Sequence, residues 1–169
     1  LIQYISDKSG IEYVSSAEPG QKGWNEAVAM RVMADHIRAI SFVIADGQLP
    51  SNNKAGYVIR RILRRAVRYA YTFLNFKEPF LNQLVPVLAD QFKGVFDELY
   101  HQKDFVQKVV LEEEVSFLRT LEKGIRKFED YYLEGVGNNL ENTIISGNST
   151  STSKDEIMAQ FSANANKSF

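Results

Sequence analysis

Apolar residues recur every three or four positions along most of this chain, as they do on one face of an amphipathic helix. The pattern predicts a helix end at residues 1–5, a loop, and then four longer helices. These lie at residues 25–46, after residue 53, at residues 78–99 and at residues 103–132. No apolar-polar alternation is long enough to predict a strand. The expected fold is therefore all-α: a helical bundle with one long C-terminal helix and a mobile polar tail.

The helix over residues 25–46 is expected to be mostly buried, with Asn25 as its N-cap and Gly47 as its C-terminal stop. Its apolar positions at helical intervals are Val28, Val32, Ala39, Phe42, Val43 and Ala45. The helix near residues 78–99 is expected to begin at Glu78, with a start or a kink close to Pro86.

The long helix over residues 103–132 carries an apolar seam, typical of a helix that packs along a neighbour. Glu113 interrupts this seam, whose members are Val106, Val110, Phe117, Leu121, Ile125, Phe128 and Tyr132. The glycines and asparagines of residues 135–139 predict a turn. Small polar residues dominate from Ser146 onward, so residues 146–169 are the expected mobile tail.

In the segment that follows Asn53, basic and apolar residues are divided most sharply between the two sides of the predicted helix. At about 100° per residue, five arginines share one arc of the predicted helix: Arg60, Arg61, Arg64, Arg65 and Arg68. The opposite arc is apolar: Ile59, Ile62, Leu63, Ala66, Val67, Ala70 and Phe73. Guanidinium groups are planar, permanently charged and matched to phosphate oxygens, which favours a nucleic-acid partner. Two alternatives remain: a link to the acidic residues 112–114 within the chain, and a plain solvated face.

Charge is unevenly distributed although the formal net charge is only −1. Residues 21–75 hold nine Lys and Arg against three Asp and Glu, a balance of +6. Residues 76–145 hold eight against thirteen, a balance of −5. The basic segment fits a polyanion partner. The acidic segment either limits nonspecific adhesion or is an ordinary solvated surface.

Several classes of function find no support in the sequence. Cysteine is absent, and neither His36 nor His101 has a partner at metal-ligand spacing, so no metal site is expected. We expect no catalytic residue, because no glycine-rich phosphate loop, Ser-His-Asp set or paired catalytic carboxylates can be assembled. No membrane partner is expected, because no apolar stretch reaches about 20 residues. The chain opens at Leu1 without methionine, and we expect it to be a piece of a longer polypeptide.

Asn52 and Asn53 directly precede the arginine helix. An asparagine there either caps the helix through its side chain or presents its amide, with both donors and acceptor, to a partner. From these residues alone, capping is the favoured interpretation, and the second stays open.

Three blocks of sequence closely resemble alanyl-tRNA synthetases: ADHIRA at residues 34–39, IADGQLPSN at residues 44–52 and GYVIRRILRRAVR at residues 56–68. The resemblance continues through EPFL at residues 78–81, LVP at residues 84–86 and FLRTLEKG at residues 117–124. It covers about residues 26–147, which is most of the chain.

The resemblance implies three segments: the end of a catalytic region with a linker at residues 1–24, a helical tRNA-recognition domain at residues 25–145, and a polar tail at residues 146–169. It implies that the domain grips the acceptor stem of alanine tRNA, whose identity signal is a G·U wobble pair. By the Pro-Ser-Asn pattern, Asn52 is the expected base-reading residue. The expected phosphate-binding residues are Lys54, Arg60, Arg61, Arg64, Arg65 and Arg68.

The resemblance also implies a parent enzyme, a cytoplasmic, ATP-dependent alanine–tRNA ligase of class II. ATP and Mg are expected in its catalytic domain and Zn in its editing domain, with no cofactor in this chain. The expected partners are the tRNA and those two domains. After Gly147 the sequence departs from the family, so an acidic base-reading partner expected there cannot be assigned. The alternative is a helical protein-interaction module that does not bind RNA.

Overall fold

In this computed structural model, the backbone is described for residues 1–145 and the side chains for residues 1–132. All regular secondary structure among the described residues is helical, which confirms the all-α prediction. The helices are α1 (Ile2–Ser9), α2 (Trp24–Ala45), α3 (Lys54–Phe73), the 3-10 helix η1 (Leu81–Gln83), α4 (Leu84–Gln91), α5 (Asp97–His101) and α6 (Lys103–Ile145). The chain divides into two compact units, residues 1–123 and 124–169, and the core and the site lie in the first.

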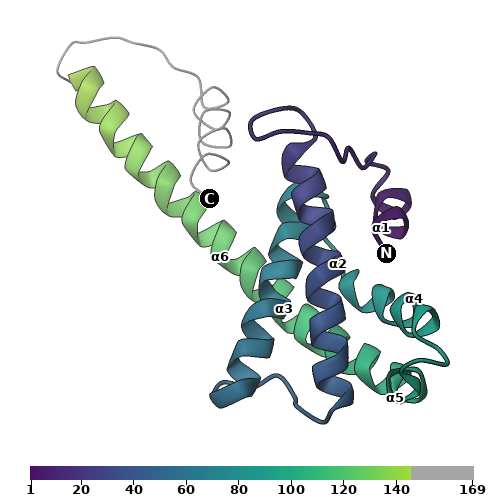
Figure 1. Ribbon diagram of the computed structural model, residues 1–169. Coiled ribbons are helices and arrows are strands. Elements are labelled where there is room, and N and C mark those ends of the chain that lie inside the picture. Colours follow the sequence, from purple (N-terminus) through teal and green to yellow (C-terminus); the bar gives the residue numbers. More distant parts are fainter. Residues whose placement is uncertain (146–169) are drawn as a thin grey trace. The chain divides into compact units, whose positions relative to one another are not determined.

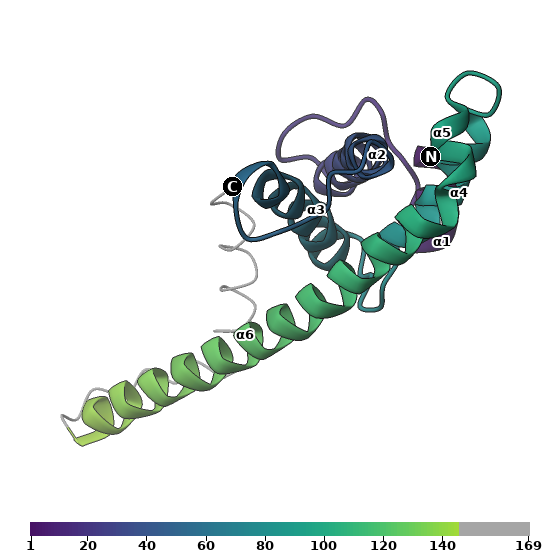
Figure 2. The same cartoon turned by 90° about the horizontal axis from the view of Figure 1, so that it is seen from below.

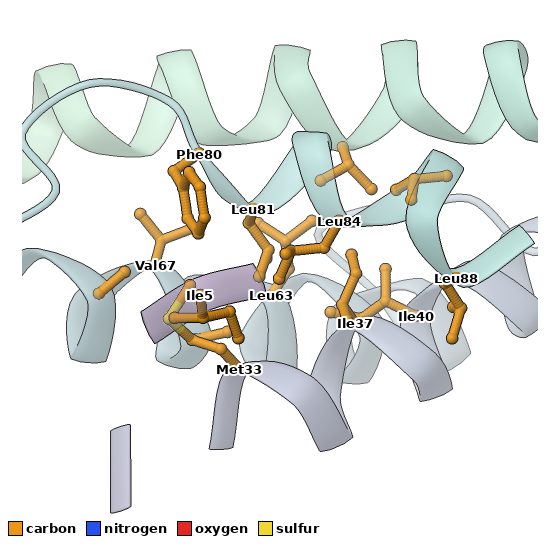
Figure 3. Packing of buried hydrophobic residues seen from close by; sticks show 14 of the residues in the cluster. Ile5, Met33, Ile37, Ile40, Leu63, Val67, Phe80, Leu81, Leu84 and Leu88 are labelled. Carbon is orange, nitrogen blue, oxygen red and sulfur yellow. The ribbon is translucent and has the colours of Figure 1, made fainter. Parts of the chain in front are cut away.

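The core of the first unit is built on α2 and α3, which lie side by side in both views (Figure 1 and Figure 2). η1 and α4 cover this pair, and their apolar side chains face those of α2 and α3 (Figure 3). Ile5 of α1 and the first half of α6 complete the same cluster. The fully buried side chains at its centre include Met33, Ile37, Leu63, Leu81, Leu84 and Leu88.

The buried face of α2 differs from the one expected. Met30, Met33, Ile37, Ile40 and Ile44 are buried there. Five of the predicted positions, Val28, Val32, Phe42, Val43 and Ala45, are only partly buried, and Ala39 is exposed. α2 is apolar around most of its circumference, so periodicity alone cannot select its inner face.

The predicted helix over residues 78–99 is interrupted. η1 and α4 cover its first part, the backbone leaves the helix after Gln91, and α5 begins only at Asp97. Gly94 lies in this break with a φ of 81°, a left-handed conformation that glycine adopts without steric cost. Pro86 does mark a helix start, since it lies in the first turn of α4, where no intrahelical N–H is needed.

Two predicted helix boundaries are also wrong. Gly23, not Asn25, precedes the first turn of α2. The turn expected at residues 135–139 is absent, because α6 continues through these residues to Ile145. A glycine inside a helix costs only about 1 kcal/mol relative to alanine, so it weakens a helix without ending it. The predicted mobile tail, residues 146–169, lies outside the described residues.

Glu114 occupies a core position of α6. Val106, Val110 and Leu118 are buried, and Glu114 falls between them at the same four-residue spacing with 2% exposure. Its carboxylate accepts three backbone N–H bonds, from Phe80, Leu81 and Asn82, and a fourth bond from the Asn82 amide. Burial raises the pKa of the Glu114 carboxyl, and these donors oppose that shift. The carboxylate therefore ties the start of η1 to α6.

Glu114→Gln is expected to lower the free energy of unfolding by about 2–4 kcal/mol, because an amide NH2 would face backbone donors that then lack an acceptor. Urea denaturation would measure the loss. Glu112→Gln is the matched control, since Glu112 is exposed on the same helix. Equal stability of the two variants would contradict the anchoring role.

Candidate RNA-binding surface

The five arginines of α3 do not share one environment. Arg61, Arg65 and Arg68 are exposed on the side that faces away from the core, whereas Arg60 and Arg64 are partly buried. The predicted apolar face is confirmed, since Ile59, Leu63, Ala66, Val67 and Ala70 are buried and Ile62 and Phe73 are partly buried. α3 thus presents three surfaces: an apolar face, an outward basic face and an edge against α6.

Arg60 and Arg64 belong to the edge against α6. The Arg64 guanidinium lies 5.4 Å from the centre of the Phe117 ring, a cation–π distance. Nη2 of Arg60 donates to Oε1 of Glu113 at 2.5 Å. The link to the acidic residues that the sequence left open therefore exists, and it involves one arginine and the middle glutamate.

The loop between α2 and α3 is folded tightly against the first turns of α3. Ser51 organises it: its N–H donates to the carbonyl of Gly56 at 3.0 Å, and its hydroxyl donates to the carbonyl of Asn53 at 2.9 Å. Gly56 permits this approach, because a Cβ there would lie 2.2 Å from Ser51 Oγ and 2.5 Å from the Leu49 carbonyl oxygen. The loop therefore holds Asn52 in a defined place beside α3.

Asn52 is exposed, and its Oδ1 accepts a hydrogen bond from Nη1 of Arg60. Arg60 thus contacts Asn52 with one terminal nitrogen and Glu113 with the other. The side chains of Arg60 and Glu113 are only 20% and 16% exposed. The loop, α3 and α6 meet at this guanidinium.

Neither asparagine caps α3 as the favoured interpretation expected. Asn53 is at the N-cap position, with an extended φ of −142°, but its side chain makes no capping bond. Its Oδ1 lies 3.4 Å from the Ser51 hydroxyl instead. The exposed Lys54 follows with a left-handed φ of 49°, which costs about 1–2 kcal/mol for a residue with a Cβ. The contacts within the loop stabilise this strained backbone conformation at the start of α3.

The sequence offered Glu113 and Glu114 only as members of the acidic group 112–114, an alternative partner of the arginines, and Glu113 also as an interruption of the α6 seam. The buried position of Glu114 was missed. The spacing did contain a signal: Glu114 lies four residues after Val110 and four before Leu118, in register with the core. A carboxylate in such a position must find hydrogen-bond donors when it is buried.

Within residues 1–132, no group of three or more His, Asp or Glu side chains is placed to hold a metal ion. Over the same part of the chain, none of the helices combines the length and the apolar character that a membrane span requires.

The first unit is thus an all-helical core with exposed arginines on the outward face of α3 and an asparagine loop held against the start of that helix. The profile of the family described as tRNA synthetases class II (A) matches residues 1–151. The chain belongs to this family.

Curated proteins that are similar to this chain include alanine–tRNA ligases. The one from Cytophaga hutchinsonii is 67% identical over 129 residues, which are 76% of this chain and 14% of that protein. The one from Bacteroides fragilis is 58% identical over 126 residues, 75% of this chain and 14% of that protein. The one from Christiangramia forsetii is 52% identical over 134 residues, 79% of this chain and 15% of that protein. This chain therefore spans about a seventh of the length of these relatives.

Gly56→Ala is expected to displace the loop and to lower the free energy of unfolding by about 1–3 kcal/mol, as overpacking does. The Leu49 carbonyl belongs to the backbone and cannot rotate away from the new Cβ. Chemical denaturation measures the effect. Gly124→Ala on α6 is the control: nothing lies within 4 Å of its Cβ position, so stability should rise by about 0.5–1 kcal/mol. A neutral Gly56→Ala variant would refute the tight loop.

Proposed function

We propose that this chain contains the acceptor-stem recognition domain of an alanine–tRNA ligase, within residues 25–145. The observation that carries the proposal is the exposed Asn52, which Arg60 holds in the loop directly before α3, the helix whose outward face carries the exposed Arg61, Arg65 and Arg68. Family membership and the alanine–tRNA ligase relatives support it.

The exposed basic residues would hold the RNA backbone. Arg61, Arg65 and Arg68 point away from the core, and Lys54 lies at the start of the same helix. Contacts to phosphates fix the register of a protein on a duplex without reading its sequence. Arg64 is partly buried and stacked on Phe117, so we assign it a smaller share of phosphate binding.

Asn52 would read one base pair. In a G·U wobble pair the exocyclic amine of guanine has no partner across the pair, and A-form RNA exposes it in a wide, shallow minor groove. The Asn52 Oδ1 accepts from Arg60 and keeps a second lone pair, as a carbonyl oxygen does. That lone pair can accept a hydrogen bond from the guanine amine.

The parent protein would be a class II, ATP-dependent ligase that joins alanine to its tRNA in the cytoplasm. Its ATP and Mg would be held by the catalytic domain and its Zn by the editing domain, so these two domains are the protein partners of this chain. The described residues themselves contribute binding and orientation of the RNA.

Asn52→Ala should selectively remove the preference for the wobble pair. The test compares the binding of the 169-residue chain to two acceptor-stem duplexes that differ only by G·U or G–C at one position. The loss of discrimination should be about 1–3 kcal/mol, the usual size of a base contact. Asn53→Ala is the neighbouring control. Equal losses on both duplexes, or no binding to either, would count against the proposed function.

Arg61→Gln should make binding less dependent on salt. Each lost phosphate contact should reduce the log–log salt slope by about 0.7–0.9, because fewer counterions are released. Both duplexes should lose the same affinity. Lys108→Gln, an exposed change of equal charge on α6, controls for net charge. An unchanged slope in Arg61→Gln would exclude a phosphate role for this residue.

A further inference from the structure

We propose that Arg60, which Glu113 holds in place, is a positioning residue for Asn52. Its role is to orient the Asn52 amide rather than to contact a phosphate. The inference rests on the proposed function, since it concerns how Asn52 is aimed at a base pair. It separates Arg60 from the other arginines of α3.

The surroundings of Arg60 differ from those of a phosphate-binding arginine. Its side chain is 20% exposed, its Nε is buried, and its two terminal nitrogens are directed to Asn52 and Glu113. The Glu113 carboxylate at 2.5 Å compensates the guanidinium charge. Arg61, the next residue, is exposed on the outward face. A polyanion would therefore meet Arg61, whereas Arg60 is engaged within the fold.

The contact with Arg60 fixes which end of the Asn52 amide faces which way. An arginine has only donors, so only the amide oxygen can face it. An exposed asparagine without such a partner can turn its amide over and exchange its oxygen with its NH2. A turned amide would present a donor to the guanine amine, itself a donor, and the reading contact would be lost. The guanidinium thus selects the orientation that can accept.

Glu113 makes this orientation depend on α6. Arg60 and Glu113 lie 53 positions apart in the sequence, and Glu114, next to Glu113, is bound by the backbone of residues 80–82. The buried Glu114 fixes the rotation of this part of α6 about its axis and so points Glu113 at α3. A planar guanidinium can satisfy both partners at once with different nitrogens.

The test is a double-mutant cycle between Asn52 and Glu113, which are both bonded to Arg60. The readout is the ratio of affinities of the 169-residue chain for the G·U and G–C duplexes. Glu113→Ala should lower this ratio at least about threefold, with unchanged G–C affinity and salt slope. In the Asn52→Ala background, Glu113→Ala should cause no further change in the ratio, because its effect passes through Asn52.

Two further variants complete the test. Glu112→Ala, an equal truncation at the exposed neighbour, should leave the ratio unchanged. Arg60→Lys keeps the positive charge but loses the planar guanidinium that bonds two partners at once. It should therefore lower the affinity ratio as Glu113→Ala does, and it tests the inference even if the Glu113→Ala variant folds poorly. Thermal melting of each variant separates loss of folding from loss of reading.

The outcomes distinguish this inference from the proposed function. If Asn52→Ala lowers the ratio but Glu113→Ala and Arg60→Lys do not, the positioning role is overturned while base reading stands. Equal loss of affinity on both duplexes with a smaller salt slope in Arg60→Lys would make Arg60 a phosphate contact. An additive effect in the double mutant would also overturn the inference. If wild-type protein shows no preference between the duplexes, the proposed base reading fails.

Discussion

The buried carboxylate of Glu114 is the constraint on which the site depends. A carboxylate withdrawn from water is costly unless its lone pairs are satisfied, and here donors from residues 80–82 satisfy both oxygens. Only one rotation of α6 about its axis brings Glu114 to these donors. The same rotation directs Glu113, its neighbour in sequence, to Arg60. A structural carboxylate in the core thus determines the partner of an arginine near the surface.

The arginines of α3 acquire different roles because the helix has three neighbours: the core, α6 and solvent. Arg60 and Arg64 lie at the edge against α6, where a carboxylate and an aromatic ring take up their guanidinium groups. Arg61, Arg65 and Arg68 are exposed. In our proposal the three exposed arginines bind the RNA backbone whatever its base sequence, and Arg60 supports the reading of one base pair by Asn52. Affinity and specificity would then depend on different arginines of the same helix.

How well the sequence predicted each element follows from how clearly its residue types are separated. α3 was predicted correctly on its apolar face, because arginines and apolar residues divide its circumference. α2 was predicted as a helix with the wrong inner face, because apolar residues surround it. The break between α4 and α5 was missed, since Gly94 and the aromatic residues around it give no clear stop in the periodicity. The carboxylate at position 114 was missed because its donors lie on another segment.

The sequence by itself determined the helical class, the amphipathic arginine helix and the resemblance that led to Asn52, because these depend on residue type and on spacing along one helix or loop. Only the tertiary structure decided which arginines face outward, which face of α2 is buried and how the Asn52 amide is held. These depend on contacts such as Arg60 with Glu113, 53 positions apart. Periodicity records the direction of a side chain from its own helix, and it carries no information on which distant residue will meet it.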